Sequence, residues 1–527
     1  MKKIINIKWI YVFAVALTFT FCTDFDDLNT DPTESSDLDP NLQIPTVQIL
    51  QSNQADNLHR IFIYPGGFMN QWTNDWAVIE YGGRGAKNSA YFYDIWNMYN
   101  SGIISNVVDL VERTRDVPEY TNIHAIGRIL KVQIFLRMTD LYGDIPYSEA
   151  GLGYYQGIFM PKYDEQKDIY DDFFKELKEA VASFTTSQPL ATADLYYNGN
   201  IEKWKKYANS LRLRIALRLV KVDPERARTE AQLAVNDGVF TSNADICRVQ
   251  HDNVQEDVGA SAGNGVANIL LRSNTNFRLT TEMIDPMEKM KDPRITLYGG
   301  SYLDDNNRTD ITPQVYTHYG TYKQMTMGAQ LFSYDEEVQT AAITIEVDGR
   351  EVEVERLYQF LQPSKLITNP GSPYIHMSYA EVEFLLAECV VRGYISGDAA
   401  SHYKKGLEAA VRQWSLFGAE VQESRVLEFS ANNPLKSGDE LNQINTQLWI
   451  LHFLDPAETW SNWRRSGLPD IKFYNYRPAL NETGGKTPRR LQYPVDEQNN
   501  NYANWKAAVD RLGGSDNWMA RMWWDRE

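Results

Sequence analysis

The stretch IEKWKKYANSLRLRIALRLV, residues 201–220, decides the fold class more firmly than any other part of the sequence. Its apolar side chains recur every three or four residues, at Trp204, Ala208, Leu211, Ile215 and Leu219. That spacing places them on one face of an α-helix, because a helix completes a turn in about 3.6 residues. The stretch is therefore predicted to be a helix with one face turned towards a core.

The same helical spacing occurs along three further stretches. Their apolar residues are Ile126, Leu130, Ile134 and Met138; Ile169, Phe173 and Leu177; and Tyr403, Leu407, Ala410 and Trp414. Two pairs of helices with short connections are expected, 164–184 with 201–220 and 376–392 with 398–415. Such pairs stack, since each covers the apolar face that its neighbour exposes. The chain is therefore predicted to be mainly α, with stacked helix pairs.

The strongest strand pattern lies at residues 343–355. Apolar residues alternate with polar ones on both sides of Asp348-Gly349, which is typical of a two-residue hairpin turn. Residues 240–340 and 420–440 have no clean period and are predicted to be long loops. No composition break marks a second domain, so residues 43–527 are expected to form one domain.

The first 22 residues have the order of charge and hydropathy found in exported proteins. Lys2, Lys3 and Lys8 precede an apolar run, WIYVFAVALTFTF (residues 9–21), which is shorter than the roughly 20 residues that span a bilayer. Residues 1–21 are therefore predicted to be a signal peptide. Cys22 follows at the position where bacterial lipoproteins receive diacylglycerol, so a lipid is expected on Cys22. A plain signal peptide is the alternative, and Phe21 departs from the small residue usual before the cleaved bond.

Residues 22–42 are acidic and rich in Asp, Asn, Ser and Pro, which is typical of a solvated tether. No other stretch is apolar over a length that could cross a bilayer. The protein is therefore expected to be anchored to a membrane by lipid rather than to span it.

The charge and the cysteines exclude several classes of function. The chain of 527 residues carries 70 acids against 52 Lys and Arg, a formal charge of −18. Nucleic-acid binding needs a basic face, so this balance argues against it. Only three cysteines occur and none forms a CxxC pair, which argues against a cysteine-based zinc or redox site and against a disulfide scaffold.

Motifs of catalysis are missing from the sequence, which contains no HExxH, GxSxG or Walker A loop. The string Gly484 to Thr487 imitates the end of a Walker loop, but Leu480 replaces its first Gly and Pro488 blocks the following helix. Acidic and amide residues at 304–310 lack the glycine of a calcium loop, so a solvated turn is expected there. No catalytic residue, metal ligand or cofactor is predicted. A carboxylate pair for glycoside hydrolysis remains an alternative, because 70 acids offer no basis for choosing one.

Two mixtures of aromatic and polar residues are the candidate ligand sites. Residues 68–96 read FMNQWTNDWAVIEYGGRGAKNSAYFYDIW, and the candidates in them are Trp72, Asn74, Trp76, Arg84 and Tyr91. The second mixture contains Tyr316, Tyr319 and Tyr322. Sugar rings offer apolar C–H faces and a rim of hydroxyls, which flat aromatics with nearby amides and Arg can match. The alternative is that these aromatic residues pack in the core.

Several segments, in order along the chain, resemble the SusD/RagB family of outer-membrane lipoproteins from Bacteroidetes. They are CTDFDD (22–27), NTDP (29–32), TDLYGDIPYSEA (139–150), FMPKYDEQ (159–166), WKKYANSLRLR (204–214), MSYAEVEFLLAE (377–388), ETWSNWRR (458–465), PRRLQYP (488–494) and MWWD (522–525). The nutrient-binding, SusD-like branch is the most similar.

This resemblance implies a SusD-like fold, with tetratricopeptide-like helix pairs on one side and an irregular, loop-rich half with small β-hairpins that carries the ligand site. It implies no enzymatic activity and no cofactor. It implies a cell-surface protein held at the outer membrane, with a SusC-like TonB-dependent barrel as its partner. The ligand would be an oligosaccharide, or a peptide as the alternative. A glycoside-acting enzyme and a scaffold that binds only protein remain the competing hypotheses.

The motifs themselves are expected to be framework. Gly143 and Pro146 should end the helix over 126–141, with Tyr142 and Tyr147 packed at that corner. The arginines at 464, 465, 489 and 490 are expected to pair with framework acids rather than with ligand.

Overall fold

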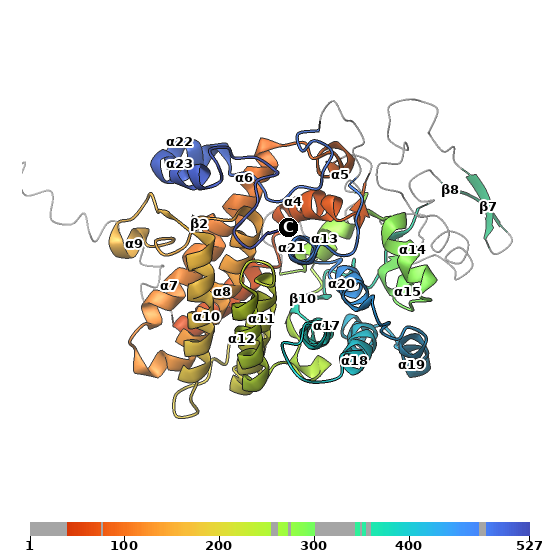
Figure 1. Cartoon of the computed structure of the whole chain (residues 1–527), viewed down its shortest axis with the longest axis horizontal. Coiled ribbons are helices and arrows are strands. Elements are labelled where there is room, and N and C mark those ends of the chain that lie inside the picture. Colours follow the sequence, from red (N-terminus) through yellow and green to blue (C-terminus); the bar gives the residue numbers. More distant parts are fainter. Residues whose placement is uncertain are drawn as a thin grey trace, which may run out of the picture.

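The computed structural model describes residues 39–74, 77–254, 262–271, 276–300, 343–347, 350–354, 360–473 and 481–527. Within them the chain is a stack of helices flanked by a loop-rich region with short strands (Figure 1). The predicted mainly α fold is confirmed.

The first run of stacked helices comprises α7 (Ile104–Thr114), α8 (Thr121–Tyr142), α10 (Gln166–Ser183), α11 (Ile201–Arg218) and α12 (Pro224–Asp237). Each packs against another of the run, α7 on α8, α8 on α10, α10 on α11 and α11 on α12. The stripe that begins at Trp204 lies in α11, where Trp204, Leu211 and Ile215 are fully buried. The helix begins at Ile201 because Asn200 caps its N-terminus: the Asn200 side chain accepts a hydrogen bond from Lys203 N.

The second run comprises α17 (Tyr379–Val391), α18 (Ala399–Arg412), α19 (Glu423–Asn432), α20 (Glu440–Leu451) and α21 (Pro456–Ser466). Helix α17 packs on α18 and on α20, and α11 of the first run packs on α17. Both helix pairs predicted from the spacing are therefore present, and contact between α11 and α17 joins the two runs.

The corner after α8 forms as predicted. The helix ends at Tyr142, and Gly143 follows with φ of +88°, which a residue without a side chain adopts at little cost. Tyr142 and Tyr147 are both buried there.

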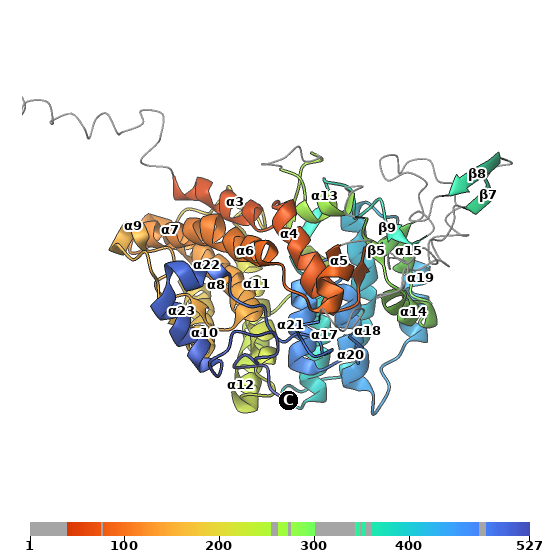
Figure 2. The same ribbon diagram turned by 90° about the horizontal axis from the view of Figure 1, so that it is seen from above.

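Shorter helices cover one edge of the stack, where Figure 2 shows α3 (Pro40–Leu50), α4 (Ala55–Ile61) and α13 (Gly265–Leu271). The other short helices are the π-helices η1 (Phe62–Gly66) and η3 (Tyr99–Ile103), the 3-10 helices η2 (Gly82–Arg84), η4 (Pro118–Tyr120), η5 (Asn243–Asp245) and η10 (Gln413–Phe417), and α5 (Ala77–Glu80), α6 (Ser89–Met98), α9 (Gly153–Gln156), α14 (Thr281–Lys289), α15 (Ile295–Tyr298), α22 (Val495–Asn500) and α23 (Tyr502–Arg511).

The described strands form antiparallel pairs and no larger sheet. The pairs are β1 (Trp72–Thr73) with β5 (Arg278–Leu279), β2 (Ile145–Pro146) with β3 (Tyr163–Asp164), β4 (Cys247–Gln250) with β10 (Pro373–Met377), β6 (Gly299–Gly300) with β9 (Gln362–Pro363), and β7 (Ile343–Val347) with β8 (Arg350–Val354). The pair β7–β8, in which Val347 lies opposite Arg350, is the hairpin predicted around Asp348-Gly349.

Two expectations about loops and boundaries are wrong. The stretches 240–340 and 420–440, which were predicted to be long loops, contain β4, α13, α14 and α19. Helix α13 shows why. Gly265 to Leu270 are all buried, so the helix has no exposed polar face and no apolar stripe at the helical period that the sequence could reveal. Helix α3 begins at Pro40, so residues 40–42 belong to the folded domain and not to the tether.

No helix of the described residues is long and apolar enough to cross a membrane. Cys22 and the rest of the tether up to residue 38 lie outside the described part of the chain.

Candidate functional site

The segment predicted to bind ligand, residues 68–96, folds into β1, α5, η2 and α6 against the N-terminal helices. Glycine at position 82 allows this close packing, because a Cβ there would lie 1.7 Å from the carbonyl oxygen of Ile63. Asn88 then starts α6, since its side chain accepts hydrogen bonds from Ala90 N and Tyr91 N.

Trp72 and Asn74 lie inside the protein. The Trp72 side chain is 0% exposed, its Nε1 donates to Phe453 O at 2.7 Å, and its ring stacks on Phe453 with centroids 5.6 Å apart. Asn74 is 2% exposed and accepts a hydrogen bond from Val78 N. A ring enclosed by other aromatic side chains has no free face for a sugar. This placement argues against ligand contact by both residues and favours the alternative, core packing.

Tyr91 has the opposite placement, half-buried at the surface on α6. The Arg60 guanidinium lies 4.1 Å from the centre of its ring, and the Tyr81 ring meets it edge-on at 5.4 Å. Arg60 is in turn held by Asp94, which accepts from its Nε at 2.9 Å. Burial raises the pKa of Tyr91, an effect that Arg60 partly offsets, so its hydroxyl stays protonated at neutral pH. We call Arg60, Tyr81 and Tyr91 the tyrosine cluster.

Arg60 and Tyr81 were not among the residues predicted from the sequence. Tyr81 was visible in the quoted stretch, immediately before the glycines, whereas nothing local connected Arg60 to Tyr91. The other predicted residues cannot be placed in the cluster. The backbone of Arg84 ends η2, but its side chain is outside the described part. Trp76, Tyr316, Tyr319 and Tyr322, and residues 304–310 with their acidic turn, also lie outside it.

The tyrosine cluster combines apolar and polar groups at the surface. Two aromatic rings offer apolar surface, and the guanidinium and the tyrosine hydroxyls offer polar groups beside them. Among the described residues no group of His, Cys, Asp and Glu is arranged to hold a metal ion.

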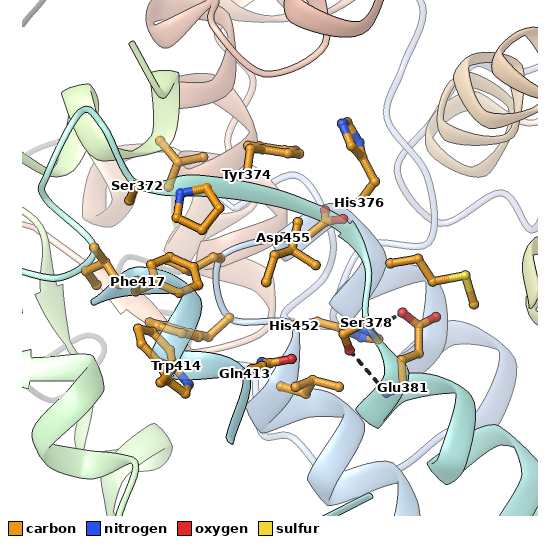
Figure 3. Close-up of a pocket in the computed structure, with 18 of the residues that line it drawn as sticks. Ser372, Tyr374, His376, Ser378, Glu381, Gln413, Trp414, Phe417, His452 and Asp455 are labelled. Atoms are coloured by element: carbon orange, nitrogen blue, oxygen red, sulfur yellow. Dashed lines mark hydrogen bonds and ion pairs between the residues drawn. The ribbon is translucent and has the colours of Figure 1, made fainter. Parts of the chain in front are cut away.

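The second candidate ligand site is a cavity between β10, α17 and the end of α20 (Figure 3). Tyr374, His376, Glu381, Trp414 and His452 line it, and its volume is about 60 Å³. A water needs at least 10–15 Å³ measured in this way, so the cavity has room for a few waters but not for a sugar ring.

Two titratable groups of the cavity, His376 and Glu381, are held in fixed protonation states by their neighbours. Burial lowers the pKa of His376 to about 3, and Gln133 and Tyr196 hydrogen-bond its two ring nitrogens. Burial alone would raise the pKa of Glu381, but Arg214 lowers it through hydrogen bonds of 2.6 and 2.7 Å. The cavity therefore belongs to the framework that joins α11 to α17.

The framework arginines follow the expectation with one exception. Arg465 forms a paired hydrogen bond with Glu388 at 2.8 and 2.9 Å, Arg489 pairs with Asp525, and Arg490 pairs with Asp516.

Arg464 differs from these three. It donates to main-chain carbonyls, that of Asp140 at 2.6 Å and that of Arg489 at 2.9 Å, and its guanidinium lies 3.8 Å from the centre of the Trp460 ring. Burial lowers the pKa of Arg464 to about 9.

Comparison with known proteins identifies the family to which this architecture belongs. A family model described as "Starch-binding associating with outer membrane", of the SusD-like type, matches residues 46–494. The chain belongs to the SusD-like family. The family expected from the sequence motifs is thus confirmed, and so is its fold.

Solved structures resemble the SusD-like chain over nearly its whole length. One described as a chitin-binding protein is 34% identical, with a TM-score of 0.80 over 93% of this chain and 100% of that chain. A Bacteroidetes SusD-like protein, AC2a, is 28% identical, with a TM-score of 0.82 over the same shares. A chitin-binding SusD homologue from Flavobacterium johnsoniae, 24% identical with a TM-score of 0.70 over 92% of this chain and 97% of that chain, shares the fold. The comparison with curated proteins found no match.

Proposed function

We propose that this SusD-like protein captures oligosaccharide at the cell surface and passes it to a SusC-like TonB-dependent transporter in the outer membrane. The observation that supports the binding role is the tyrosine cluster, in which two aromatic rings lie 5.4 Å apart and the guanidinium of Arg60, on α4, lies 4.1 Å from the ring of Tyr91, on α6. The C–H faces of sugars pack on such rings, and polar groups beside the rings form hydrogen bonds with the sugar hydroxyls.

Oligomers of N-acetylglucosamine are the proposed ligand. The support is the 34% identical structure described as a chitin-binding protein, which this chain covers completely. Peptide remains the alternative ligand, and the protein is proposed to bind without chemical conversion.

Isothermal titration with chitin oligosaccharides tests the binding role. Tyr91→Ala should weaken binding at least tenfold, because aromatic residues at the centre of a binding surface contribute about 2 kcal/mol or more. Tyr93→Ala is the matched control, since Tyr93 lies on the same helix and is 41% exposed. It should leave the affinity unchanged. Equal losses in both variants, or none in either, would overturn the role of the tyrosine cluster.

The same samples separate the competing functions. Release of reducing ends from the oligosaccharide would favour a glycoside-acting enzyme. Binding of peptides but not of sugars would favour the peptide-binding alternative, and binding of neither would favour a scaffold for protein partners.

Anchoring and delivery form the second part of the proposal. The lipid on Cys22 and the tether would keep the protein close to the transporter, which raises its effective concentration there without new contacts. Affinity purification of the native protein from detergent-extracted outer membranes should recover a TonB-dependent barrel. Recovery of the protein alone, under conditions that preserve other lipoprotein–barrel complexes, would leave a free-standing surface binder.

A further inference from the structure

A groove lies between α14, α20 and the segment 469–472, separate from the tyrosine cluster. Helix α14 contributes Glu282 and Pro286, and α20 contributes Asn442 and Thr446. Each pair is spaced four residues apart, so each helix turns one face to the groove. Its volume is about 460 Å³, within the roughly 300–1,000 Å³ typical of small-molecule sites. Both views place α14 and α20 on the same side of α6, to its right (Figures 1 and 2).

Hydrogen bonds hold the walls of the groove in place. The Asn70 side chain donates to Lys472 O at 2.7 Å, which ties the 469–472 segment to the loop before β1. The Trp449 indole, also lining the groove, donates to Met69 O at 3.0 Å. A site built on two helices and a tied segment is largely formed before a ligand arrives, which lowers the entropic cost of binding.

The groove also contains polar groups that the protein leaves unsatisfied. Asn70 is 2% exposed, and its Oδ1 accepts no hydrogen bond from the described part of the chain. The Thr446 hydroxyl is half-buried and the Asp470 carboxylate is exposed, and neither has a hydrogen-bond or ion-pair partner among the described residues, so both are open to a ligand. Leaving the buried Asn70 acceptor unpaired is costly, so a ligand that brings a donor to it is favoured.

These features select one class of ligand. Apolar surface from Ile471, the two prolines and the small exposed part of Trp449 suits a C–H-bearing face, and the open acceptors suit hydroxyl or amide donors. Glu282 and Asp470 give the lining more negative than positive charge, which disfavours an anionic ligand.

We propose that the α14–α20 groove is a second saccharide site, which binds an uncharged sugar unit independently of the tyrosine cluster. Its ligand class rests on the proposed function, but its location and its residues do not.

Titration of N-acetylglucosamine trisaccharide into the full folded chain tests the groove. Asn442→Trp fills it, and Thr446→Val removes one hydroxyl at nearly constant shape. In a Tyr91→Ala background the remaining binding should fall more than tenfold with Asn442→Trp. It should fall about fivefold with Thr446→Val, the effect of one net hydrogen bond. Lys289→Trp, an exposed position on α14 outside the groove, is the control and should change nothing.

The outcomes separate the two proposals. If wild-type protein binds the trisaccharide and Tyr91→Ala weakens it, yet Asn442→Trp and Thr446→Val both leave all binding unchanged, the groove proposal is overturned and the proposed function stands. If the wild-type protein binds no saccharide, both are overturned. Thermal melts of each variant show whether it is folded, and Thr446→Val keeps the test decisive if Asn442→Trp does not fold.

Discussion

Replacing Glu388 by Gln should destabilise the whole domain, because this carboxylate pairs α17 with α21 in the interior. Glu388 is fully buried and accepts hydrogen bonds from Arg465 at 2.8 and 2.9 Å and from Arg392 at 2.8 Å. Burial alone would raise its pKa, but Arg465 and Arg392 together lower it from 4.5 to about 2. The carboxylate is therefore much more stable as an anion in the folded protein than in the unfolded chain.

The magnitude follows from that pKa. A fall of about 2.5 pH units corresponds to roughly 3 kcal/mol of stability at neutral pH, at about 1.4 kcal/mol per unit. Because the folded pKa is the lower one, this contribution is present above pH 4.5 and is lost as the pH falls towards 2. In Glu388→Gln the Arg465 guanidinium remains buried without its counter-charge. Removing one partner of a buried ion pair typically lowers the free energy of unfolding by about 3–5 kcal/mol.

Urea unfolding at pH 7, followed by circular dichroism, measures this loss. For a chain of this length the same loss lowers the melting temperature by roughly 3–5 °C. The difference between wild type and variant should shrink between pH 5 and pH 2. Glu423→Gln is the control, since Glu423 pairs with Arg412 on the surface and its loss should be undetectable.

A variant as stable as the control, or a difference that does not shrink in acid, would refute this account of the pair. The double variant Glu388→Leu with Arg465→Met gives a second check. Replacing both charges by apolar residues should restore much of the stability that Glu388→Gln alone loses.

Three further predictions concern the binding segment and the anchor. Trp72→Ala should lower the free energy of unfolding by about 3–5 kcal/mol, as for other buried aromatic residues. Trp76→Ala should instead weaken oligosaccharide binding and leave the melting temperature unchanged. Calorimetric titration and thermal melts of both variants check this, and the reverse pattern would contradict it. Gly82→Ala should destabilise the fold and weaken binding together, because its Cβ would lie 1.7 Å from Ile63 O, and wild-type behaviour in both assays would show that the backbone can yield there. Cys22→Ala should release the protein from the outer membrane, as measured by fractionation, since acyl chains contribute about 0.8 kcal/mol per buried CH₂; a variant that stays in the outer membrane would point to another anchor.

Much of the helical stack was predictable from the sequence. Helices α10 and α18 bury one face over several turns, so their apolar residues recur at the helical period. Helices α8 and α11 are buried on most sides, but apolar residues at the helical period still mark them in the sequence. The hairpin at 343–354 was predictable for a similar reason, because strand alternation and an Asp-Gly turn are local signals. Helices α13 and α19 escaped prediction, since one is buried on all sides and the other buries only Val426, Phe429 and Ser430.

The fold class and the family follow from the sequence alone, because periodicity and motifs are local properties of the chain. The positions of the aromatic residues, Trp72 against Phe453 in the core and Tyr91 against Arg60 at the surface, became clear from the three-dimensional structure. It also shows that the arginine at 465 meets a glutamate 77 positions away. Contacts of this kind depend on which faces of distant helices meet, and the free energy of burying one ring rather than another is set by all of its neighbours together.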